Sequence, residues 1–132
     1  MATTIKVVDV GLGLITAALV ASTSKYLGWG TGTNAAAHGD TALQTPANTA
    51  RVAGTQSQQQ TTVANDTYQV SGTMTNGTGA ALAVTEAAVF DGAGSGGPPT
   101  GANLYARAAF AAVNLDPNDS ILFIWKTSFV SG

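Results

Sequence analysis

From about residue 23 onward, short runs of alternating apolar and polar residues are separated by turn-forming residues. In one of the clearest runs, Tyr68, Val70 and Met74 alternate with polar neighbours. Such a period of two is typical of half-buried strands. The first such run spans residues 25–33 and predicts a short strand that ends in a flexible turn containing Gly28, Gly30 and Gly32. The others span residues 51–55, 61–75, 82–91, 104–115 and 120–130. We therefore expect strands to make up most of the fold after residue 22.

The segments between these runs predict how the strands are connected. Asn76-Gly77 tolerates positive φ and favours a tight hairpin between the runs on either side of it. Residues 116–119 (DPND) form a strong turn signal and predict a second hairpin. Residues 34–46 show no clear period, and residues 92–101 are too rich in Gly and Pro for regular structure. We expect both of these segments to be loops.

The apolar pattern is different near the N-terminus, where it has helical spacing. Residues 9–22 are predicted to form an amphipathic helix lying on a sheet. The face expected to be buried carries Val8, Leu12, Ile15 and Leu19. Asp9 would favour the first turn. This stretch is shorter than the roughly 20 residues of a membrane-spanning helix, although it also has the apolar length of a signal peptide that would be cleaved near Ser22.

Together these elements predict a mainly β protein, an antiparallel β-sandwich or jelly-roll-like domain with one short N-terminal helix. No linker divides the chain, so we expect residues 1–132 to form a single domain. Residues 1–8 are predicted to be an N-terminal arm or an edge strand. Ile5 and Val7 are the apolar residues of this arm that we expect at an interface.

Only 9% of the residues are charged, and the net charge is −2. An ordinary soluble domain carries about a quarter charged residues, and a surface so poor in charge is weakly protected from association. The five scattered Lys and Arg residues provide no basic patch for nucleic acid. The absence of cysteine excludes disulfides and thiolate metal sites. This composition favours an assembly subunit and predicts no cofactor, no metal, no nucleic acid and no membrane as partners.

Few residues are candidates for chemistry. His38 lies in a predicted loop without a nucleophile elbow anywhere in the sequence, so we interpret it as a solvated histidine. Glu86 stands in mid-strand between apolar neighbours, and a carboxylate buried there needs a partner. Arg107, also in mid-strand, is the candidate for that partner. We predict a structural ion pair, within or between subunits, and no enzymatic activity.

Six segments resemble small structural proteins of tailed-bacteriophage virions. They are KYLGWGTGT (residues 25–33), TALQTPANTAR (41–51), GTQSQ (54–58), NDTYQVSGTMT (65–75), VTEAAVFD (84–91) and NLDPNDSI (114–121). The resemblance runs from about residue 11 to 129, includes no catalytic signature, and is greatest to capsid (head) decoration or cement proteins. The chain departs from the pattern mainly at residues 92–100, which look expanded.

The resemblance implies a β-rich subunit, commonly a homotrimer, that sits on the capsid surface of a virion with the major capsid protein as its partner. On this hypothesis residues 2–8 would add a strand to a neighbour's sheet edge. Tyr26 and Trp29 would be aromatic anchors at an interface, and packing in the core is the alternative for both. Two other classes stay open, a tail or tail-fibre component and a secreted adhesin or pilin-like subunit.

Overall fold

The computed structural model describes residues 3–132. These residues form two compact units. The first contains the chain up to residue 22 together with residues 55–71 and 124–132, and the second contains residues 23–54 and 72–123. The elements are α1 (Asp9–Ala21), β1 (Tyr26–Gly30), β2 (Val52–Ala53), β3 (Thr55–Gln59), β4 (Thr67–Thr75), β5 (Leu82–Phe90), β6 (Leu104–Leu115) and β7 (Ser120–Ser128).

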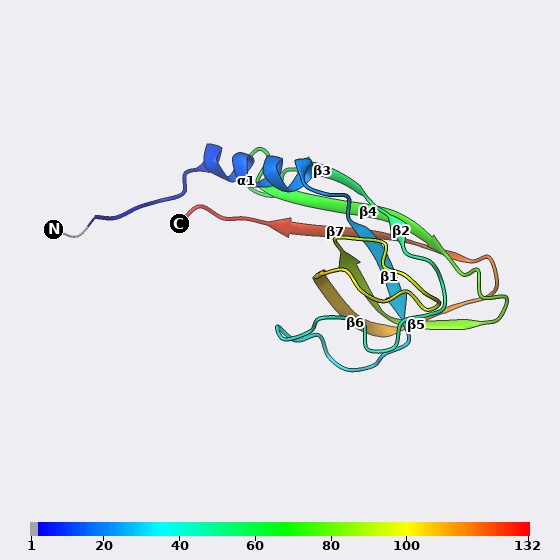
Figure 1. The fold of residues 1–132 in the computed structure, drawn as a ribbon. Coiled ribbons are helices and arrows are strands. Elements are labelled where there is room, and N and C mark those ends of the chain that lie inside the picture. The colour runs from blue at the N-terminus through cyan, green and yellow to red at the C-terminus, as the bar shows by residue number, and fades with distance from the viewer. Residues whose placement is uncertain (1–2) are drawn as a thin grey trace. The chain divides into compact units, whose positions relative to one another are not determined.

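The predicted fold class is confirmed (Figure 1). The described chain is mainly β, with two antiparallel sheets and a short helix near the N-terminus, consistent with a β-sandwich. The strand order is β2-β1-β5-β6 in one sheet and β3-β4-β7 in the other. Within residues 3–132, no helix has the length and apolar character needed to cross a bilayer.

In the first unit, α1 packs against β3 (Figure 1). Leu12 and Thr16 are its buried side chains. The Thr16 hydroxyl donates to the carbonyl of Asn65 at 2.7 Å and accepts from the Gln58 side chain at 2.8 Å. These polar contacts turn α1 so that Ile15, predicted to be buried, is exposed. Val8, just before the helix, is exposed as well.

The strand predicted from residue 61 begins only at residue 67. The side chain of Asp66 accepts hydrogen bonds from the backbone N–H groups of Thr61, Thr62 and Val63, which folds residues 61–66 into a turn. These bonds, that from Val63 above all, hold the pKa of Asp66 well below its usual range. A local side-chain contact therefore ends the extended pattern early.

The two predicted hairpins are wrong. β4 and β5 belong to different sheets, and so do β6 and β7, so both connections cross between sheets. The buried Asn76 explains the first error, because its side-chain NH₂ donates to the carbonyls of Ala80, Leu115 and Asp116 and so ties the two connections together. A tight Asn-Gly turn would require positive φ at Gly77. In the structure, positive φ occurs at Gly79 and not at Gly77.

In the second unit, the sheet of β1 and β5 buries side chains on both faces. Leu27 and Trp29 of β1 lie on one face, where the Trp29 ring meets Phe123 of β7 edge to face at 6.3 Å. Gly28 and Gly30 lie on the other face, beneath residues 43–46. A Cβ on Gly30 would come within 2.6 Å of Glu86 Oε1. The glycines that the sequence assigned to a flexible turn therefore continue the strand and let a loop approach it closely.

Candidate functional site

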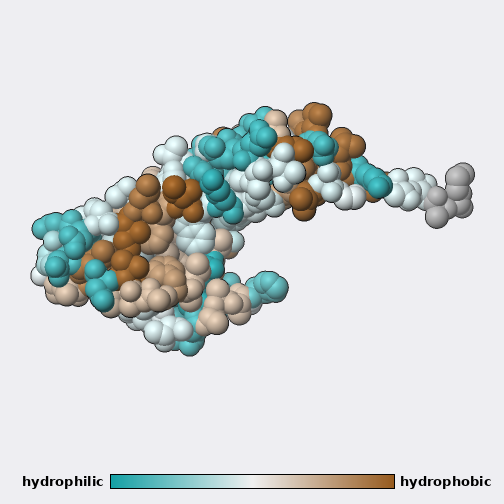
Figure 2. All heavy atoms as spheres, turned by 180° about the vertical axis from the view of Figure 1, so that it is seen from behind, coloured by the Kyte–Doolittle hydropathy of each residue, from teal (hydrophilic) through white to brown (hydrophobic). Residues whose placement is uncertain are grey.

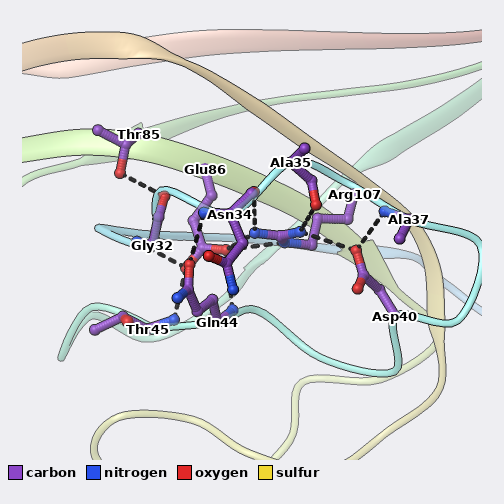
Figure 3. Close-up of polar contacts among 10 residues, drawn as sticks. All are labelled: Gly32, Asn34, Ala35, Ala37, Asp40, Gln44, Thr45, Thr85, Glu86 and Arg107. Carbon is purple, nitrogen blue, oxygen red and sulfur yellow. Dashed lines mark hydrogen bonds and ion pairs between the residues drawn. The ribbon is translucent and has the colours of Figure 1, made fainter.

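The most organised polar cluster of the second unit is centred on Glu86 of β5. Glu86 is fully buried. Its Oε1 accepts hydrogen bonds from the backbone N–H groups of Gly32 at 3.1 Å and Thr45 at 2.7 Å. Its Oε2 accepts from the backbone N–H of Gln44 at 3.0 Å (Figure 3). The carboxylate thus holds three backbone positions of the loop at residues 31–46.

Arg107 of β6 completes this cluster. Its Nε and Nη2 atoms each lie 2.9 Å from Glu86 Oε2, so the structure brings together the two residues that the sequence suggested as an ion pair. Its Nη1 also meets Asp40 Oδ2 at 2.8 Å, and its Nη2 donates to the carbonyl of Asn34 at 3.0 Å (Figure 3). The guanidinium therefore joins β5, β6 and the loop.

These contacts shift the pKa values of all three groups. Burial alone would raise the pKa of Glu86, but the N–H groups of Thr45 and Gln44 together with Arg107 lower it below the usual value. A hydrogen bond from the Ala37 N–H and then Arg107 lower the pKa of Asp40. Burial opposes the charge of Arg107, yet the two carboxylates raise its pKa. All three groups are therefore held in their ionised forms.

The polar atoms of Glu86 and Arg107 are already used to hold the loop at residues 31–46 in place. Both oxygens of Glu86 already accept hydrogen bonds from the chain itself, and the side chain of Arg107 is only 3% exposed. His38 lines a shallow hollow next to Asp40 and Tyr105 but is itself exposed. Across residues 3–132, no three His, Asp or Glu side chains are grouped so that they could hold a metal ion. The cluster is built to stabilise the second unit.

Lowered carboxyl pKa values predict that the fold loses stability in acid. The affected groups are Asp40, Asp66, Glu86 and Asp91. Each stabilises the fold at pH values above the unfolded carboxyl pKa of about 4, and this contribution is lost as the pH falls through the lower folded value. We expect the urea midpoint, followed by tryptophan fluorescence, to be constant from pH 7 to about pH 5 and to fall below that.

The variant Glu86→Gln, which removes one of these titrating groups, should show a smaller fall between pH 5 and pH 3 than the unchanged chain. Equal urea midpoints for the unchanged chain at pH 7 and pH 3 would contradict the prediction.

The first unit carries a second candidate site, an uncovered apolar surface at its N-terminal end. We call it the N-terminal apolar surface. It comprises Ile5 (88% exposed), Val7 (48%), Val8 (63%), Val10 (81%), Leu14 (72%) and Ile15 (38%). Figure 2 shows apolar side chains gathered on this N-terminal part. The residues lie on the segment before α1 and on its first two turns, and residues 3–8 form neither helix nor strand.

The residues that the sequence suggested for an interface have different environments. Ile5 and Val7 are exposed, as an arm that contacts a partner requires, while residues 1 and 2 of that arm lie outside the described residues. Tyr26 is half-buried. Trp29 is 1% exposed and packs in the core, which was the alternative left open for it.

The sequence reasoning missed Asp40 in the polar cluster and the outward-facing Val10 and Leu14 on α1. Asp40 had only its loop position near His38 as a signal. Val10 and Leu14 had a clearer one, because residues 9–21 contain apolar side chains on every side of a helix.

Comparison with known proteins adds no relative. The chain matches no protein-family profile, no curated protein and no solved structure.

Proposed function

We propose that the chain is a non-enzymatic structural subunit of a virion, a decoration or cement protein that binds the assembled capsid surface as an oligomer and stabilises the shell. The observation that carries this proposal is the N-terminal apolar surface. Six exposed large apolar residues between positions 5 and 15 are more than scattered exposure, and such patches mark sites of protein contact. The viral setting comes from the resemblance of six segments to virion structural proteins.

The physical benefit of covering this surface is large enough to support binding. Burying a Val, Leu or Ile side chain that was exposed contributes roughly 1.5–3 kcal/mol. Several such side chains buried at once could offset the cost of association, which is several kcal/mol or more. The low charge of the chain, 9% of residues, favours the same behaviour because little charge opposes close contact.

A cement protein needs two properties. It must bind the assembled lattice better than free capsid subunits, so that its binding free energy adds to lattice stability. It must also keep its shape, and the Glu86 cluster fixes residues 31–46 in the second unit. Joining several copies, as a homotrimer would, raises the effective affinity for the shell by avidity. The major capsid protein is the proposed partner, and the mechanism needs no cofactor.

Cryo-electron microscopy of the virion that contains this chain tests the proposal. We expect density for the chain on the outer surface of the head, in contact with the major capsid protein. Density on the tail or its fibres would replace the proposed location with the alternative one. Absence of the chain from the particle would overturn the virion proposal and favour the adhesin or pilin-like alternative.

Deleting residues 2–8 should lower the occupancy of the protein on shells because it removes Ile5, Val7 and Val8 from the N-terminal apolar surface. Quantitative gel analysis of shells sedimented with increasing protein measures this occupancy. We expect at least a tenfold loss of apparent affinity, because each buried aliphatic side chain contributes more than 1 kcal/mol. Equal occupancy of the deleted and full chains would remove the arm from the mechanism.

A further inference from the structure

Asn76-Gly77 is the one Asn-Gly step in the sequence, and it does not form the tight hairpin turn that this pair predicts. The structure does not require glycine at position 77 either. The φ of Gly77 lies outside the left-handed region, and a Cβ built on it would meet no atom within 4 Å. The backbone conformation therefore does not account for this pair of residues, and its chemical reactivity becomes the feature of interest.

An asparagine side chain loses its amide most readily when glycine follows it, because glycine has no side chain to hinder the reaction. The backbone nitrogen of the glycine gives its proton to the solvent and bonds to Cγ of the asparagine. The Cγ–Nδ2 bond breaks, and the amide nitrogen takes up a proton and leaves as ammonia, which closes a succinimide ring. Water then opens the ring at either carbonyl and yields aspartate or isoaspartate. Water is the only co-reactant.

The native fold holds the side chain of Asn76 in place through both of its polar atoms. Asn76 is fully buried. Its Nδ2 donates to the carbonyls of Ala80 at 2.8 Å, Leu115 at 3.3 Å and Asp116 at 3.2 Å. Its Oδ1 accepts from the backbone N–H of Thr78 at 3.1 Å and from the Thr78 hydroxyl at 2.7 Å. The nitrogen that would leave is therefore bound by three acceptors and shielded from water.

The backbone of Asn76 is bound in the same way. Its N–H donates to the carbonyl of Asp119 at 2.8 Å, and its carbonyl accepts from the N–H of Asn118 at 2.9 Å. These contacts and those of the side chain join the connection at residues 76–80 to the connection at residues 115–119. Freeing the amide therefore requires these two connections to separate, which is a local opening of the second unit.

We propose that Asn76-Gly77 is a deamidation site that the native fold protects and that reacts when the two connections separate. Neither product fits the closed structure. Aspartate donates no hydrogen bond to the three carbonyls and places a negative charge against their oxygens. Isoaspartate also adds one carbon to the backbone and so displaces its two hydrogen bonds. Deamidation of an opened chain therefore prevents it from refolding, which makes unfolding irreversible whatever the chain's function.

Mass spectrometry of the full chain in mildly alkaline buffer measures the reaction and locates it at residue 76. We expect the folded chain to deamidate there at least about tenfold more slowly than the chain unfolded in urea, because the reaction depends on the fraction of open chains. Gly77→Ala is the matched variant, since its added methyl group has free space. It should keep the urea midpoint and react much more slowly when unfolded. Equal rates for folded and unfolded unchanged chain would overturn the proposal.

Thr78→Val tests whether the contacts of Asn76 provide the protection. The substitution removes the hydroxyl that donates to Asn76 Oδ1. The rate in the folded state should rise roughly fivefold, as the loss of one average hydrogen bond implies, while the rate in urea stays the same. Thr73→Val is the control, because Thr73 is exposed on β4 and makes none of these contacts. Equal rates for the two folded variants would mean that these contacts do not protect the site.

Refolding yields test the irreversibility. The refolded fraction of the unchanged chain should fall with time spent in urea, in step with its deamidated fraction, and Gly77→Ala should keep its refolded fraction. Asn76→Asp should lower the urea midpoint by at least about 1 M. Asn114→Asp adds the same charge at an exposed position of β6 and should leave the midpoint nearly unchanged. Deamidated chain that refolds as fully as unmodified chain would overturn the irreversibility.

Discussion

Replacing Glu86 with alanine is expected to lower the free energy of unfolding by about 3–5 kcal/mol. The side chain of Arg107 is 3% exposed, and among residues 3–132 the substitution leaves it with Asp40 as its only ionic partner. It also leaves the backbone N–H groups of Gly32, Gln44 and Thr45 without their acceptor. A buried donor without an acceptor costs about 1–3 kcal/mol, so the loop at residues 31–46 should loosen as the stability falls.

Urea unfolding measures the stability of Glu86→Ala, and hydrogen exchange of the loop amides reports the loosening. Asp116→Ala is a suitable control because this carboxylate is exposed, and we expect a change within about 0.5 kcal/mol. A loss below 1 kcal/mol for Glu86→Ala, with unchanged exchange at Gln44 and Thr45, would contradict the role assigned to Glu86.

A second comparison separates the ion pair from the loop contacts. Apolar replacement of both members of a buried ion pair is often neutral or stabilising. Here Glu86→Leu combined with Arg107→Met should still be destabilising, because the three backbone N–H groups of the loop stay unpaired. Full recovery of stability in this double variant would mean that the ion pair alone matters.

The Glu86 cluster shows how far sequence reasoning reached at this site. A carboxylate in the middle of an apolar strand has to find a partner when it is buried, and Arg107 was the mid-strand cation available to it. Asp40 and the three loop N–H groups could not be predicted, because residues 31–46 have no periodicity that would place them against β5. Their contacts depend on Gly28 and Gly30, which leave room for the loop on the face of β1.

The strands were easier to predict than their pairing. Alternation along residues 82–91 and 104–115 reports which side chains share a face, and these runs match β5 and β6 closely. Alternation does not show which strand lies alongside, so the turn sequence Asn76-Gly77 predicts a hairpin that the structure does not form. The hydrogen bonds of Asn76 to Leu115 and Asp116, about 40 positions away, decide that connection. Long-range contacts of this kind leave little trace in a local pattern.

The helix shows a related limit. Residues 9–21 are apolar on all sides, so several faces have acceptable spacing, and the predicted one included Val8 and Ile15, which are exposed. Thr16 decides the orientation through its contacts with Asn65 and Gln58. A polar residue therefore determines the buried face, and Leu14 and Ile15, which it turns outward, belong to the N-terminal apolar surface.

Trp29→Ala is expected to lower the free energy of unfolding by about 3–5 kcal/mol, as removal of a large core side chain does. The Trp29 ring is 1% exposed and lies edge to face with Phe123, at an interplanar angle of 78°. Within residues 3–132, its indole N–H has no hydrogen-bond acceptor. Trp29→Phe should therefore cost much less than Trp29→Ala, because it keeps an aromatic ring in the core and removes an unpaired donor.

The comparison of Trp29 with Tyr26 decides between a core role and an interface role. Tyr26 is half-buried and lies on the opposite face of β1, so Tyr26→Ala should destabilise the isolated chain less than Trp29→Ala. Urea unfolding of the isolated chain and occupancy on shells are measured for both variants. If Trp29→Ala unfolds like the unchanged chain but no longer binds shells, then Trp29 acts as an anchor despite its burial. If it is destabilised as expected, the anchors have to be sought among exposed residues, and the N-terminal apolar surface is where the structure provides them.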